Sequence, residues 1–85
     1  MPELSRFYGI RIVMNINDHP PPHFHAEHGE DEAVVAIPSG EVIAGYLPQR
    51  ALRLVQEWRA LHQDELMDNW NRRTRGEPLF KIAPL

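Results

Sequence analysis

Three ionisable side chains alternate along one short segment of the sequence in a pattern that can support chemistry. His23, His25 and Glu27 occupy every second position. In an extended chain such residues share one face, with Cβ atoms about 6.5–7 Å apart, so two imidazoles and a carboxylate can converge on a divalent metal such as zinc. The same row can transfer protons on a phosphodiester, because histidine titrates near neutral pH. A solvated sheet face that merely tolerates histidine is the third interpretation, and the pattern leaves all three open.

Two further ionisable residues precede this row, at the start of a proline-rich loop. Asp18 and His19 stand immediately before three consecutive prolines, which fix the backbone and make the connection stiff. They can direct a carboxylate and an imidazole towards His23, or Asp18 can simply accept hydrogen bonds from the loop backbone. The candidate catalytic residues are therefore His23, His25, Asp18 and His19. The candidate metal ligands are His23, His25 and Glu27.

A second candidate surface lies in the other half of the chain. Arg50 and Arg53 are one helical turn apart and can hold phosphate or the carboxylates of a partner. With Glu27 they make up the candidate binding residues. The simpler interpretation is a solvated helix face on which these arginines pair with Glu57.

The elements that must position these side chains can be predicted from periodicity. An alternation of period two indicates strands, joined by short turns that favour an antiparallel meander. In the segment that carries the histidines, Phe24 and Ala26 are the apolar residues and must face the core. The expected strands cover about residues 7–16, 23–28, 32–37 and 41–46.

After Pro48 the apolar residues recur every three or four positions, which is typical of amphipathic helices. A second apolar stripe starts about 120° around the helix, so we expect a break near residues 62–64. The second helix should end at Gly76. The predicted core comprises Ile10, Ile12, Met14, Phe24, Val35, Ile37, Leu54, Val55, Trp58 and Leu61.

These elements together predict an α+β fold, in which an antiparallel sheet of three to four strands packs against two C-terminal helices. We expect a single domain over residues 1–85, with strands in 7–47, helices in 48–76 and a packed tail in 77–85. The length of 85 residues supports one small core.

Composition narrows the class of protein. The chain contains no cysteine, which excludes disulfides, thiolate metal sites and a cysteine nucleophile. Residues 1–47 hold two arginines against seven acids, a net charge of −5, whereas residues 48–85 hold seven cations against five acids, a net charge of +2. This distribution does not suit a general nucleic-acid binder. A signal peptide and a membrane span are not apparent, so we expect a cytoplasmic protein without a membrane partner.

Several segments resemble a known family. The stretch Asn17-Asp18-His19-Pro20-Pro21-Pro22-His23-Phe24-His25-Ala26-Glu27 is the most specific, accompanied by Ser5-Arg6-Phe7-Tyr8-Gly9-Ile10, Leu47-Pro48, Asn69-Trp70 and Gly76-Glu77-Pro78-Leu79. These features are similar to the small prokaryotic family of domain of unknown function 4160, identified as DhiT-type toxins of type II toxin–antitoxin pairs. The resemblance implies a cognate small antitoxin of the DUF2442 or DhiA type. It implies no mechanism for individual residues.

Two functions follow as hypotheses. In the first, the protein is the toxin-like component of a toxin–antitoxin pair and acts on RNA through its histidine-rich strand face. In the alternative, it is a non-catalytic module that binds a protein or a metal. A homodimer is compatible with both, and the sequence leaves open whether the protein is an enzyme.

Overall fold

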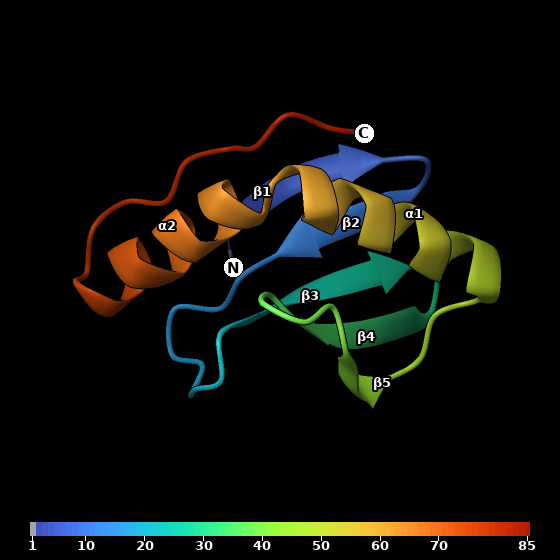
Figure 1. Ribbon diagram of the computed structural model, residues 1–85, viewed down its shortest axis with the longest axis horizontal. Helices are drawn as coiled ribbons and strands as arrows, with labels where there is room; N and C mark the ends of the chain where they lie inside the picture. The colour runs from blue at the N-terminus through green and yellow to red at the C-terminus, as the bar shows by residue number, and fades with distance from the viewer. Residues whose placement is uncertain (1) are drawn as a thin grey trace.

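The computed structural model describes residues 2–85, which form one antiparallel sheet and two helices (Figure 1). The sheet has five strands in the order β1-β2-β3-β4-β5, so each strand pairs with its neighbour in the chain. The elements are β1 (Glu3–Phe7), β2 (Ile10–Val13), β3 (His23–His28), β4 (Asp31–Ala36), β5 (Val42–Gly45), α1 (Gln49–Leu61) and α2 (Gln63–Thr74). The α+β class and the antiparallel meander are confirmed.

The expected number of strands was too small, because another strand precedes the first predicted one and a turn separates the two. Tyr8 and Gly9 both have positive φ, at 49° and 77°, and Phe7 pairs with Ile10 across this two-residue turn. Such a turn reverses the chain in the sense that matches strand twist. Residues 3–7 therefore form a separate strand, and the sheet has five strands where three to four were predicted.

Helix α1 lies over one face of the sheet, where the core is buried, and α2 continues beyond the ends of the strands (Figure 1). Trp58 of α1 is fully buried, and its ring lies 5.4 Å from that of Phe7 and 5.9 Å from that of Phe24. The prediction that Leu61 belongs to the core was wrong, because its side chain is 67% exposed. Leu61 is the last residue of α1, and it shares the flank of that helix with Leu54, which is only partly buried.

The predicted break between the helices is confirmed at His62, which ends α1 and precedes α2. Gly76 has a φ of 72°, as expected for a left-handed residue just beyond the second helix. The segment after it packs, as predicted: the Ile82 N–H donates to the carbonyl of Leu4 at 2.8 Å, and Ile82 itself is buried. The tail thus covers the outer edge of β1 (Figure 1).

Neither helix in residues 2–85 combines the length and apolar character that crossing a bilayer requires.

Candidate functional site: a carboxylate between two histidines

The alternation of β3 divides its side chains between two environments. Phe24 and Ala26 are fully buried on the face that packs against α1, so His23 and His25 lie together on the opposite face. His23 is buried, and its ring lies 5.2 Å from the ring of Trp70 in α2. The His25 side chain is only 13% exposed. The predicted histidine row is therefore a partly enclosed site.

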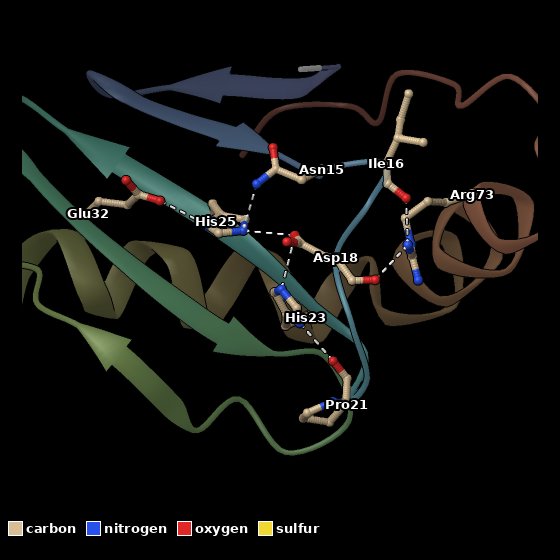
Figure 2. Close-up of polar contacts among 8 residues, drawn as sticks. All are labelled: Asn15, Ile16, Asp18, Pro21, His23, His25, Glu32 and Arg73. Atoms are coloured by element: carbon tan, nitrogen blue, oxygen red, sulfur yellow. Dashed lines mark hydrogen bonds and ion pairs between the residues drawn. The ribbon is translucent and has the colours of Figure 1, made fainter.

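Asp18 points between the two imidazoles (Figure 2). Its Oδ2 atom lies 3.1 Å from Nε2 of His23 and 2.9 Å from Nε2 of His25. These three side chains bring one oxygen and two nitrogens within 4.8 Å of one another, a spacing that a single metal ion can bridge. The proline loop, which runs from Asn17 to Pro22, returns the chain to the start of β3 and places Asp18 there.

The second nitrogen of each ring is also held. Nδ1 of His23 lies 2.7 Å from the carbonyl oxygen of Pro21, and Nδ1 of His25 lies 2.7 Å from Oε2 of Glu32. Both acceptors fix the orientation of a ring that donates from Nδ1. Each Nε2 is consequently directed at the carboxylate of Asp18.

These contacts alter the acid–base properties of the site. Burial acts to lower the pKa of His25, but hydrogen bonds and charge from Asp18 and Glu32 outweigh it, so this pKa lies above its ordinary value. Burial acts to raise the pKa of Asp18, but its hydrogen bonds with both imidazoles outweigh that effect and lower the pKa. The site therefore favours a carboxylate and positive charge in close contact.

Two further side chains support the cluster. The Asn15 side-chain amide lies 3.2 Å from Nε2 of His25, and its own Oδ1 is buried with no hydrogen-bond partner. Rotating that amide by half a turn brings Oδ1 to face the cluster. Arg73 donates from Nη1 to the carbonyls of Ile16 and Asp18, at 2.7 and 2.9 Å. Arg73 thereby ties the loop to α2 (Figure 2).

The remaining candidate residues lie elsewhere. Glu27 shares the face of His25, but register places it opposite Arg11, whose Nη1 it binds at 2.9 Å. His19 is exposed, and within residues 2–85 it takes part in no hydrogen bond or ion pair. Arg50 and Arg53 are exposed on α1, and no ion pair within the same residues involves either of them.

Glu32, Asn15 and Arg73 were not among the candidates predicted from the sequence. Glu32 begins the third expected strand, and the two-residue connection after His28 places it on β4, diagonal to His25 on the same face. That register could have been derived from the short turn. The sequence contains no comparable sign that Asn15 or Arg73 contacts the loop.

The arrangement can bind a divalent cation or transfer protons. Two imidazole nitrogens and a carboxylate oxygen are suitable ligands for zinc and other divalent metals. The same three groups can instead share protons, with His25 as the acid.

A protein-family model described as a domain of unknown function, DUF4160, matches residues 9–71. No match was found among curated proteins or among solved structures.

Proposed function

Because the chain belongs to the DUF4160 family, whose description assigns no activity, we propose its function from its own geometry: Asp18, His23 and His25 bind a divalent cation such as zinc. Glu27, the ligand first considered with the two histidines, is replaced by Asp18 in this proposal. The groups that orient the two rings fit as well. The Pro21 carbonyl accepts a hydrogen bond from Nδ1 of His23, and the Glu32 carboxylate accepts one from Nδ1 of His25.

The position of the Nδ1 atoms is the observation that carries this proposal. A neutral imidazole that donates from Nδ1 presents an unshared electron pair at Nε2. Two such pairs and a carboxylate oxygen then face one another, which is repulsive unless a cation or additional protons lie between them. Metal-bound histidines commonly donate their other ring nitrogen to a carbonyl or carboxylate in this way.

Additional protons are the less favourable way to relieve that repulsion. If His23 and His25 donate hydrogen bonds from both of their nitrogens, both rings must be imidazolium ions. Two positive charges would then lie close together, because the ring centroids are only 5.4 Å apart. His23 would then carry its charge while buried against Trp70. A divalent cation allows both rings to stay neutral and places the positive charge beside Asp18.

On the basis of the family resemblance, we further propose that the protein is the toxin-like component of a type II toxin–antitoxin pair and acts on RNA through this centre. Asp18 and Glu32 bring two carboxylates to the centre, so this surface without a cation repels phosphate. Three protein ligands leave coordination positions open, where a metal can polarise a phosphoryl oxygen or activate water. A catalytic role for the centre and a cytoplasmic location remain predictions.

Metal binding can be tested by calorimetric titration of the purified protein with zinc. We expect one site per chain, at least ten-fold weaker in Asp18→Asn, which preserves shape but removes the charge. Glu27→Gln is the matched control, because Glu27 lies on the same strand face but pairs with Arg11. No zinc binding, or an equal loss in both variants, would contradict the proposal.

The toxin proposal has a separate test in growth arrest after induced expression. Wild type should arrest growth, and the His23→Ala/His25→Ala double variant should not, at equal amounts of folded protein. Arrest that persists in the double variant would favour the alternative function, a non-catalytic module that acts by binding a protein. Arrest that survives metal chelation but not His25→Ala would favour proton transfer, for which the raised pKa of His25 is the supporting observation.

A cognate antitoxin of the DUF2442 or DhiA type is the partner we propose, on the basis of the family resemblance. Co-expression with the product of the adjacent gene, followed by size-exclusion chromatography, tests it. We expect co-elution, and a homodimer is the form to look for when the partner is absent. Separate elution at micromolar concentration would exclude a stable complex.

A further inference from the structure

A cavity of about 410 Å³ lies far from the proposed metal centre, between the β1–β2 turn, the end of β3 and the start of α1. His28, at the end of β3, lines this cavity. It lies five residues from His23 along the strand, so the two histidines are on opposite faces of the sheet and about 16 Å apart. Ile10 and Leu54 contribute apolar surface, and Arg50 contributes a cation. The volume is within the range that suits a small organic ligand.

Tyr8, at the rim of this cavity, has a backbone conformation that is unfavourable for a residue with a large side chain. It is the only non-glycine residue with positive φ in residues 2–85, and its position in the two-residue turn normally favours asparagine or glycine. Its side chain is 67% exposed, so packing within the protein does not compensate for the strain. Residues in such conformations are commonly found at binding sites. An aromatic ring held open beside an apolar cavity is suited to stack on a planar ligand.

Arg50 gives the cavity a preference for negative charge. No ion pair in the described residues involves it, and the first turn of α1 contains no acidic side chain that could neutralise it. A guanidinium matches the two oxygens of a carboxylate and binds them with a pair of hydrogen bonds. His28 adds a second polar group at the same cavity.

We propose that this cavity binds a small molecule with a planar, apolar body and a carboxylate group. The body lies between Tyr8 and the apolar wall formed by Ile10 and Leu54, and the carboxylate binds Arg50. This site is separate from the metal centre and does not depend on it.

The test is a nuclear magnetic resonance titration of the whole protein with indole-3-carboxylate and with its uncharged counterpart, indole-3-carboxamide. We expect the carboxylate to bind at least ten-fold more tightly and to shift resonances of Tyr8, His28 and Arg50. Arg50→Gln should abolish this ten-fold preference. Arg53→Gln is the matched control, because Arg53 is an exposed arginine of the same helix that does not line the cavity, and it should leave the preference intact.

Tyr8→Asn separates binding from stability. Asparagine tolerates the turn conformation, so this variant should raise the melting temperature while weakening both probes several-fold. Failure of both probes to bind at millimolar concentration would overturn the proposal, as would an equal response of Arg50→Gln and Arg53→Gln. A Tyr8→Asn variant that binds as well as wild type would show that Tyr8 has no part in the site.

Discussion

Arg73 of α2 holds the backbone of Asp18, the residue that lies between the two histidines. Its Nη1 donates to the Asp18 carbonyl at 2.9 Å, and its guanidinium is stacked 3.7 Å above the ring of Trp70. The same Trp70 ring contacts His23. One turn of α2 therefore sets the position of both the carboxylate and an imidazole.

Replacing Arg73 by Gln should weaken the centre without removing a ligand. The loop loses its hydrogen bonds at Ile16 and Asp18, so zinc affinity should fall about ten-fold, as is typical when a residue that supports metal ligands is lost. Calorimetric titration measures this. Arg75→Gln is the control, since Arg75 is exposed and within residues 2–85 forms an ion pair with Glu77 alone. Equal affinities in the two variants would exclude this role for Arg73.

The stabilisation of the protein by zinc should increase with pH, whereas the metal-free protein should lose stability. The pKa of His25 is raised by folding, so its protonated form stabilises the metal-free protein. That contribution is complete below about pH 6.5 and is lost as pH rises through the raised pKa. Zinc requires neutral imidazole, so stabilisation by zinc should grow over the same range.

Melting temperatures measured with zinc and with a chelator, from pH 5 to pH 8, test this expectation, and their difference should increase with pH. In His25→Asn the decline of the metal-free protein should become shallower. A difference that stays constant across this range would show that protons and zinc do not compete at the centre.

Trp58→Ala should unfold the domain or nearly so. The side chain is fully buried against Phe7 and Phe24, and such truncations cost roughly 3–5 kcal/mol, a large part of the stability of a small domain. Trp58→Phe should cost less, although it removes the hydrogen bond from Nε1 to the Ala83 carbonyl, worth about 1 kcal/mol. Urea denaturation followed by circular dichroism distinguishes these losses. A Trp58→Ala variant with nearly the wild-type free energy of unfolding would show that Trp58 is not part of the core.

Asn69→Ala should loosen the tail. The buried Asn69 side chain donates to the Phe80 carbonyl and accepts from the Phe80 N–H, so its loss should cost roughly 1–3 kcal/mol. Hydrogen exchange at the Ile82 amide should accelerate, because that amide bonds to Leu4 only while the tail is in place. Asn71→Ala, an exposed position on the same helix, should change neither quantity.

The fold class could be predicted because the apolar period changes from two to between three and four near Pro48. The first hairpin could not, because Tyr8 and Gly9 are not a usual turn pair and the apolar alternation continues through them. The buried residues change parity there, from Ser5 and Phe7 to Ile10 and Ile12. That shift of phase is visible in the structure but not in the sequence, because Tyr8 continues the alternation of Ile10 and Ile12.

For the candidate site, the strand period placed His23 and His25 together, and proximity along the chain indicated Asp18. The choice between Asp18 and Glu27 as the third group depends on pairing between strands, which puts Arg11 opposite Glu27. Contacts from α2 depend on how the helix docks, and no local pattern in the sequence encodes that. The hydrogen bonds from Arg73 to the loop carbonyls therefore could not be predicted from the sequence.

The edge of β1 is closed by a segment from the far end of the domain, where the Ile82 N–H bonds to the carbonyl of Leu4 and Trp58 donates to Ala83. During synthesis, Leu4 of β1 and Trp58 cannot form these hydrogen bonds until residues 82 and 83 have been made. The domain can complete its core only after residue 83 has left the ribosome tunnel, which is later than the translation of this segment. Until then, β1 offers an unpaired edge to any other extended chain nearby.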